Sequence, residues 1–126
     1  MMEHLIRDAG KASPAIDFDP VSGVLSMRGE SYPENTFEFF RPVMAWLRDY
    51  LAEATAPVSM ELELSYLNTG SIKCLMDMFD LLDAHHQEGK AARIVWRYHA
   101  NNPRALETAE EFAEDLSLPF HIEQYS

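Results

Sequence analysis

The chain has 126 residues, of which 47% are apolar, so it is long enough and apolar enough to form one domain around its own core. Its 10 basic and 21 acidic residues give a formal net charge of −11, which argues against binding to nucleic acid or to an anionic membrane. A single cysteine, Cys74, excludes an internal disulfide, and the N-terminus carries acidic residues without a hydrophobic signal region. We therefore expect a cytoplasmic protein.

The N-terminal part of the chain divides into a flexible segment and a hairpin. Residues 1–13 mix polar and small side chains and predict a flexible N-terminus, which is followed by a single domain over residues 14–126. Two alternating segments, Ala15–Asp19 and Val24–Arg28, flank a loop that contains proline and glycine. This pattern is typical of a β-hairpin.

A polar connection, Gly29–Asn35, leads from this hairpin into the first predicted helix. Apolar residues recur at helical spacing over about residues 36–54, and Asn35 is suited to cap the start of the helix. Pro42 lies inside the pattern, and it predicts a kink or a restart because its ring nitrogen has no hydrogen to donate. The expected core-facing residues of this helix are Phe37, Phe40, Met44, Leu47 and Leu51.

The middle of the chain combines the clearest strand with a second helix. Residues 58–66 alternate between apolar and polar side chains, which predicts a strand. A helical pattern follows from about Ser71 to Gln87, and Gly89 is its predicted stop. The expected core-facing residues of this helix are Ile72, Leu75, Phe79, Leu82 and His86.

The last third of the chain predicts a strand, a helix and a short final strand, over residues 92–99, about 103–116 and 120–123. Helices connect the successive strands, which favours parallel pairing. Because the strands alternate instead of being apolar throughout, one face of the sheet should be open to solvent or to a partner. We therefore predict an α/β domain with a mixed five-stranded sheet and helices mainly on one face. On the open face, ion pairs are expected among four side chains: Glu61, Glu63, Arg93 and Arg97.

The junction between the middle strand and its helix is the most informative stretch of the chain. It reads Ser-Tyr-Leu-Asn-Thr-Gly-Ser-Ile-Lys over residues 65–73, and it brings hydroxyl side chains next to the free backbone N–H groups of a helix N-terminus. A phosphate on Thr69, at or just before the N-cap, would add about −1.5 to −2 charges, which the helix dipole would favour by about 0.3–1 kcal/mol. Lys73 follows one turn later and is placed to screen that charge. The alternative is that Thr69 or Ser71 only caps the helix.

The second candidate site is the segment Ser31–Asn35 of the polar connection. In the predicted topology it lies at the same edge of the sheet as the junction. Tyr32 is suited to anchor a partner, as aromatic residues often do at interfaces, and Glu34 is suited to meet a basic residue. The alternative is a structural role, in which Pro33 fixes a turn and Asn35 caps the helix.

Metal binding and catalysis find little support in the sequence. Asp80, Asp83, His85 and His86 lie close together along the chain, but a zinc site needs three or four convergent ligands. Cys74 has no nearby partner for nucleophilic chemistry. The sequence contains neither a phosphate-binding glycine loop nor a Gly-x-Ser-x-Gly nucleophile elbow. We therefore expect a binding protein without a metal or cofactor, and not an enzyme.

The last predicted helix carries a dense acidic run. Its members are Glu107, Glu110, Glu111, Glu114 and Asp115. Such a run is either a solvated helix face or a surface that docks on a basic partner.

Two segments of the chain, Leu25–Asn35 and Tyr66–Ile72, resemble the SiaC family of bacterial regulatory phosphoproteins. Further similarity runs through Met76–Leu82, Glu110–Asp115 and Pro119–Phe120. The order of the predicted elements is also similar to that of the STAS domain of anti-anti-sigma factors. The resemblance therefore implies a STAS-like fold.

The resemblance also implies a phosphorylation switch. Proteins similar to this one are phosphorylated on the threonine of a Leu-Asn-Thr segment, here Thr69, by a cognate Ser/Thr kinase, and a PP2C-type phosphatase removes the phosphate. The unphosphorylated form binds and activates a diguanylate cyclase, which raises cyclic di-GMP and promotes aggregation or biofilm growth. The residues expected to bind partners are Tyr32, Glu34, Asn35, Leu67, Asn68, Gly70, Ser71 and Lys73.

Gly70 departs from the pattern of the family, in which a small hydroxyl residue follows the threonine. The departure leaves the hydroxyl group of Thr69 in place and predicts a more permissive backbone at the junction. The similarity to anti-anti-sigma factors supplies an alternative function. In that case Thr69 would control the capture of a kinase or an anti-sigma factor.

Overall fold

The computed structural model describes residues 2–126, which form one six-stranded sheet and three helices. The strands are β1 (Leu5–Arg7), β2 (Ala15–Phe18), β3 (Val24–Ser31), β4 (Val58–Leu67), β5 (Ala92–His99) and β6 (Phe120–Tyr125). The helices are α1 (Thr36–Glu53), α2 (Thr69–Gln87) and α3 (Pro103–Glu114). The predicted mixed α/β fold is confirmed.

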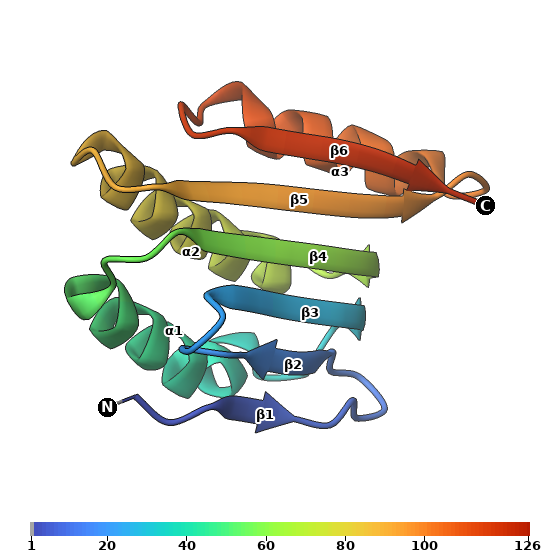
Figure 1. Ribbon diagram of the computed structural model, residues 1–126. Helices are drawn as coiled ribbons and strands as arrows, with labels where there is room; N and C mark the ends of the chain where they lie inside the picture. The colour runs from blue at the N-terminus through green and yellow to red at the C-terminus, as the bar shows by residue number, and fades with distance from the viewer. Residues whose placement is uncertain (1) are drawn as a thin grey trace.

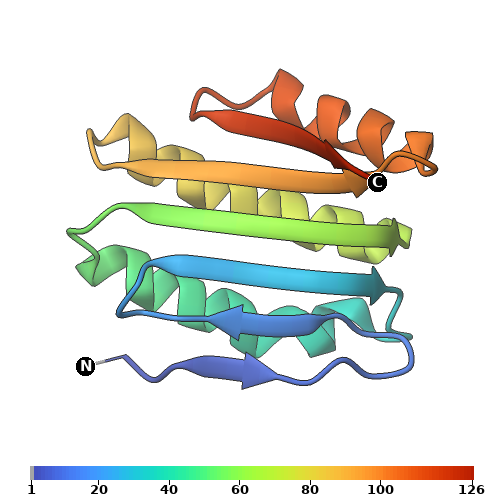
Figure 2. The ribbon, with the colours of Figure 1, turned by 45° about the vertical axis from the view of Figure 1, so that its right-hand side comes forward.

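The strands lie in the sheet in the same order as in the sequence, from β1 at one edge to β6 at the other (Figure 1). β1, β2 and β3 are antiparallel neighbours, whereas β3 to β6 run parallel and are connected by the helices. Crossovers of this kind are right-handed, and here each one steps in the same direction along the sheet. All three helices therefore cover the same face, as both ribbon views show (Figures 1 and 2).

The prediction of five strands is wrong, because the N-terminal segment adds a sixth. β1 pairs with β2, and its residue Leu5 is buried opposite Phe18. The indole nitrogen of Trp46 in α1 also donates a hydrogen bond to the carbonyl of Glu3 at 2.6 Å. The segment that was predicted to be flexible therefore contains a strand over residues 5–7. A three-residue strand is too short to produce an alternation that can be recognised in the sequence.

The core lies between the sheet and the three helices. Alternate residues of the strands point into it, and both tryptophans are buried, with Trp96 fully enclosed and Trp46 8% exposed. The largest side chains with almost no exposed surface are Trp96, Phe18, Phe40, Phe79, Ile16, Leu25, Met27, Leu47, Met60, Leu62, Leu75 and Met78. Within residues 2–126, no helix combines the length and the apolarity that crossing a membrane requires.

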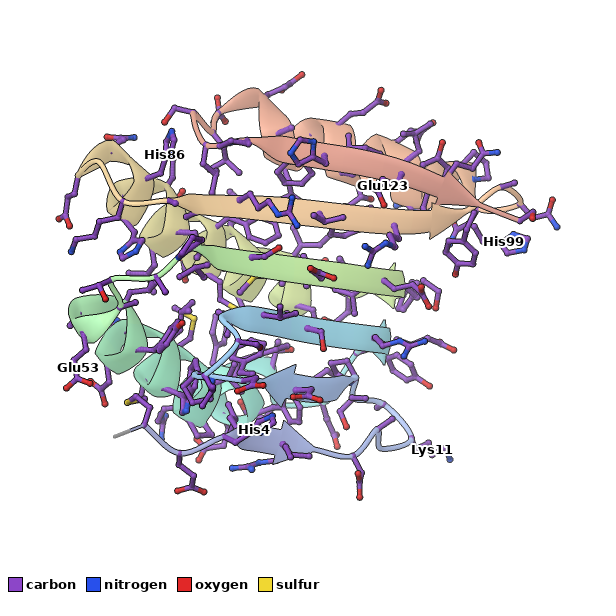
Figure 3. All side chains as sticks on the ribbon, in the orientation of Figure 1. His4, Lys11, Glu53, His86, His99 and Glu123 are labelled. Atoms are coloured by element: carbon purple, nitrogen blue, oxygen red, sulfur yellow. The ribbon has the colours of Figure 1, made fainter. Side chains whose placement is uncertain are left out.

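The opposite face of the sheet carries polar side chains and no helix (Figure 3). Arg97 of β5 forms ion pairs with Glu61 of β4 at 3.3 Å and with Glu123 of β6 at 3.1 Å. Arg28 of β3 approaches Glu63 at 3.7 Å. The expected pairing across neighbouring strands is therefore confirmed for Glu61 and Arg97, whereas Arg93 donates to the hydroxyl group of Ser59 instead.

Two details of the helices differ from the sequence pattern. α1 continues through Pro42 without a restart. Phe37, which was expected to face the core, is 60% exposed, because Thr36 and Phe40, one turn apart, occupy the inward face of this helix. In α2, His86 was expected to face the core. Instead His85, three residues after Leu82, is buried, and His86 is only half-buried.

Asp83 fastens the second half of α2 to the segment that leads into β6. One of its carboxylate oxygens accepts three hydrogen bonds of 2.9 Å, from the backbone N–H and hydroxyl groups of Ser117 and from the backbone N–H of Leu118. Burial alone would raise the pKa of this carboxyl group, but the hydrogen bonds from Ser117 and Leu118 outweigh burial and hold the pKa below its ordinary value of 3.8. Asp83 is therefore a structural anchor between α2 and the segment that leads into β6.

We expect replacement of Asp83 by alanine to lower the free energy of unfolding at pH 7 by about 1.5–3 kcal/mol, because it removes hydrogen bonds to a charged acceptor. Since the folded-state pKa is lowered, the contribution of the charge is complete above the unfolded-state pKa and is lost as the pH falls through the folded-state value. The stability difference between the wild type and Asp83→Asn should therefore shrink below about pH 4. Urea denaturation at pH 7 and pH 3 measures both effects.

The matched control is Asp80→Asn, which changes an exposed carboxylate on the same helix. It should alter stability by less than about 0.5 kcal/mol. Equal stabilities of the wild type and Asp83→Ala would contradict the anchoring role.

Candidate functional site

The two candidate segments meet at the C-terminal ends of the parallel strands β3 and β4. β3 and β4 are parallel neighbours, so the connection after β3 and the junction after β4 leave the sheet side by side (Figure 1). The N–H of Asn68 donates to the carbonyl of Ser31 at 3.0 Å, and the side-chain amide of Asn68 donates to the carbonyl of Pro33 at 3.4 Å. The hydroxyl groups of Ser31 and Ser71 share a buried hydrogen bond of 2.7 Å. These contacts form a clamp, which we call the Ser31–Ser71 clamp.

Asn68, and not Thr69 or Ser71, caps α2. Its side-chain oxygen accepts a hydrogen bond from the N–H of Ser71 at 2.8 Å, and its carbonyl accepts the first helical hydrogen bond, from Ile72. The helix thus begins at Thr69, two residues before the predicted start. The sequence pattern missed this start because Gly70 is a poor helix former, whereas asparagine and serine are equally good caps.

Thr69 is the accessible hydroxyl residue in the first turn of α2. Its side chain is exposed, whereas Ser71 is fully buried and hydrogen-bonded to Ser31. The backbone N–H groups of Thr69 and Gly70 have no hydrogen-bond partner among residues 2–126. Two free donors therefore lie next to the exposed hydroxyl group, at the positive end of the helix dipole.

Gly70 is needed for close packing at the junction. A Cβ atom at this position would lie 2.5 Å from Oγ1 and 2.8 Å from Cβ of Thr36, the first residue of α1. Thr36 is itself held in place, since its hydroxyl group donates to the carbonyl of Pro33 at 3.2 Å. The absence of a side chain at Gly70 therefore lets the starts of α1 and α2 touch.

Aromatic side chains gather around the clamp. The rings of Tyr32 and Tyr66 meet edge to face with centroids 5.8 Å apart, and their residues are 38% and 51% exposed. The hydroxyl group of Tyr32 donates to the carbonyl of Lys11 at 3.1 Å, and Lys11 lies at the same edge of the sheet in Figure 3. Phe37, in the first turn of α1, is 60% exposed.

If the alternation in β4 continued without interruption, Tyr66 would point into the core together with Leu62 and Leu64. A bulge between Gly29 and Glu30 shifts the register with β4, so that Gly29 is opposite Leu64 and Glu30 is opposite Tyr66. Gly29 has a φ of +110°, which favours glycine. Tyr66 therefore joins the exposed surface, and its place just before the junction was the only sequence signal for that role.

The remaining predicted partner-binding residues have distinct surroundings. Asn35 caps α1 by accepting from the N–H of Glu38 at 3.2 Å, while Glu34 is exposed and Leu67 is half-buried. The ammonium group of Lys73 contacts Asp77 at 2.7 Å, and this hydrogen bond raises the pKa of Lys73. Lys73 lies one turn from Thr69, so its charge is close to the junction although Asp77 already shares it.

The geometry of residues 2–126 gives no support for a metal site on α2. Residues 2–126 contain no group of three or more histidine, cysteine or carboxylate side chains placed to hold one ion. Burial raises the pKa of the Cys74 thiol and lowers the pKa of the His85 imidazole, which favours the neutral form of both groups. The Cys74 side chain is therefore disfavoured as a thiolate, which is the form that nucleophilic chemistry needs.

Comparison with known proteins gives consistent matches over nearly the whole chain. A family model described as SiaC family regulatory phosphoprotein matches residues 7–125. An uncharacterized protein of Pseudomonas aeruginosa (strain UCBPP-PA14) is 46% identical over 115 residues, which make up 91% of either chain.

Solved structures agree with this match. SiaC of Pseudomonas aeruginosa superposes with a TM-score of 0.92 at 44% identity, covering 98% of this chain and 100% of that one. A chain in the crystal structure of the diguanylate cyclase SiaD with its activator SiaC, from the same organism, gives a TM-score of 0.93 at 45% identity, over 96% and 99% of the two chains. Both candidate segments lie within the residues that the family model matches. The chain therefore belongs to the SiaC family of regulatory phosphoproteins.

Proposed function

We propose that the unphosphorylated protein binds and activates a diguanylate cyclase and thereby raises cyclic di-GMP and promotes biofilm growth or aggregation. A cognate Ser/Thr kinase blocks this activation by phosphorylating Thr69, and a PP2C-type phosphatase restores it. The protein is then a regulatory partner and not a catalyst. The structure of SiaD with its activator SiaC supports the choice of a cyclase as the partner.

One structural observation carries the proposal. Thr69 is an exposed hydroxyl residue in the first turn of α2, three residues along the chain from Tyr66 of the exposed aromatic pair Tyr32 and Tyr66, and the Ser31–Ser71 clamp joins the two segments that carry these side chains. Exposed aromatic side chains on a rigid frame are suited to anchor a partner. A modification of Thr69 therefore changes the charge of a surface that is already suited to binding.

The fold should tolerate a phosphate on Thr69. The free N–H groups of Thr69 and Gly70 and the dipole of α2 favour a negative charge at this position by about 0.3–1 kcal/mol. The ammonium group of Lys73, one turn further along, is able to move between Asp77 and the phosphate. We therefore expect no unfolding of the junction.

A bound partner would experience the phosphate differently. A protein packed over Tyr66 and the start of α2 excludes water from Thr69, so that two negative charges would have to be desolvated or paired. The neutral hydroxyl group of threonine imposes no such cost. The effect of phosphorylation thus falls on the complex and not on the free protein.

The first test maps the modification and measures its effect on binding. After incubation with the kinase, mass spectrometry should find the phosphate on Thr69, and the phosphorylated protein should bind the cyclase at least about tenfold more weakly, a loss of about 1.4 kcal/mol. Thr69→Val should keep full activation and resist the kinase, because valine has the shape of threonine without the hydroxyl group. Calorimetric titration and a cyclase assay measure the two effects.

Ser65→Ala is the control, since Ser65 is another exposed hydroxyl residue, four residues before Thr69 near the end of β4. It should be phosphorylated and should activate the cyclase as the wild type does. A phosphate on another residue, or full activation by the phosphorylated protein, would refute the switch at Thr69. Capture of an anti-sigma factor in place of a cyclase would favour the alternative partner-switching function.

The second test concerns the aromatic surface. Tyr66→Ala should weaken cyclase binding by about 2 kcal/mol or more if Tyr66 is an interface anchor, while the stability of the free protein changes little because the side chain is half exposed. Tyr125→Ala, which removes a tyrosine 40% exposed near the end of β6, should leave affinity unchanged. If the two substitutions change the calorimetric affinity equally, Tyr66 is not an anchor of the interface.

A further inference from the structure

Arg104, the second residue of α3, is an exposed cation near the junction. Its guanidinium group takes part in none of the ion pairs among residues 2–126, whereas Lys73, the other cation near Thr69, contacts Asp77 at 2.7 Å. The chain carries 21 acidic residues against 10 basic ones, so an arginine without a carboxylate partner is notable in it. The charge of Arg104 is therefore available to a further anion.

The fold brings the start of α3 close to the start of α2. β4 and β5 are parallel neighbours, so the helices that follow them begin at the same end of the sheet (Figure 2). The side-chain amide of Asn102, which caps α3, donates to the carbonyl of Ser65 at 3.0 Å. This hydrogen bond ties the start of α3 to the end of β4, only four residues before Thr69.

Two connected hollows separate Arg104 from the face of α2 that carries Thr69. A cavity of about 50 Å³ is lined by Arg104, Ile72 and Tyr66, and a groove of about 460 Å³ between α2 and α3 is lined by Arg104, Ile72 and Met76. Thr69 precedes Ile72 by three positions and Met76 by seven, so these three residues lie on one stripe of α2. Thr69 and Arg104 therefore border the same gap, one from α2 and the other from α3.

A phosphate on Thr69 has the chemistry that a guanidinium group binds best. Phosphothreonine carries about −1.5 to −2 charges at neutral pH and three strong acceptor oxygens. The planar fork of arginine donates two parallel hydrogen bonds to such oxygens, which makes the pair both strong and directional. The neutral hydroxyl group of threonine offers no charge and only one oxygen. An attraction between Arg104 and position 69 therefore arises only after modification.

We propose that Arg104 binds the phosphate on Thr69 and thereby links the first turns of α2 and α3. The inference rests on the proposed function for the phosphate, but the choice of Arg104 follows from the gap that the two residues border. Only the rotamer of Arg104 has to change, so the backbone of α3 stays in place. In the phosphorylated protein alone, the linked side chains close the gap next to Tyr66. Modification then changes the shape of this surface as well as its charge.

The test measures the second pKa of the phosphate by ³¹P NMR titration of the full chain. Phosphothreonine is incorporated at position 69 during translation, so the measurement does not need the kinase. An adjacent guanidinium group favours the dianion, so the phosphate pKa should be at least about 0.5 lower with Arg104 present than in Arg104→Gln. Because Arg104 is exposed, this substitution should leave the fold intact. Carboxylates that line the groove act in the opposite direction, but equally in both proteins. They are Asp80, Glu107, Glu111 and Asp115.

Three further variants separate Arg104 from the other cations. Arg48→Gln removes an exposed arginine of α1 that also takes part in no ion pair within residues 2–126, and it should leave the phosphate pKa unchanged. Lys73→Gln should raise the phosphate pKa less than Arg104→Gln does, because Asp77 already shares the charge of Lys73. Arg104→Lys keeps the charge without the two parallel donors, so it should give an intermediate value.

The outcomes separate the inference from the proposed function. An unchanged phosphate pKa in Arg104→Gln, or an equal rise in Arg48→Gln, would overturn the role of Arg104 and leave the switch at Thr69 intact. A larger rise in Lys73→Gln would also overturn it, because the phosphate would then belong to Lys73. If the kinase places no phosphate on Thr69, the proposed function fails, and the titration still decides whether Arg104 binds a phosphate at this position.

Discussion

The Ser31–Ser71 clamp is the interaction on which the rest of the site depends. It joins the end of β3 to the start of α2 through a buried hydroxyl pair and two hydrogen bonds of Asn68. Buried polar groups are costly unless they are paired, so this paired cluster fixes the geometry at the edge of the sheet. The contact between Gly70 and Thr36 closes the same region from the side of α1. Thr69 is thereby exposed on a frame with little freedom to relax.

A rigid frame determines how a charge at Thr69 can act. In a flexible loop, a phosphate would find new partners by moving the chain, but the capped first turn of α2 leaves little room for such movement. The new charge therefore remains at the surface, close to the aromatic pair of Tyr32 and Tyr66. In the proposed function, modification of Thr69 and binding of the partner are coupled through proximity, without a second conformation of the domain. The one-sided sheet supports this arrangement, since all helices and their starts lie on one face.

Much of the fold follows from patterns that short stretches of sequence display. The alternation in β4 and the helices between successive strands predict the layered architecture, and the hydroxyl-rich stretch after β4 marks the site. Contacts between distant residues are not visible in this way. The close approach of Gly70 to Thr36 and the exposure of Tyr66 depend on how β3 and β4 are registered. The formation of β1 and the burial of His85 depend on packing against neighbouring elements. At these positions such packing outweighs the local sequence pattern.

The central claim is that a phosphate on Thr69 blocks binding while leaving the fold unchanged. The most direct measurement is a residue-by-residue comparison of backbone amide NMR spectra of the free protein before and after phosphorylation. The account predicts shifts confined to the Ser31–Ser71 clamp and the first turns of α1 and α2, with the rest of the sheet unaffected. Shifts throughout β3, β4 and β5, or a loss of dispersed signals, would show that the phosphate acts by disrupting the domain and would contradict the account.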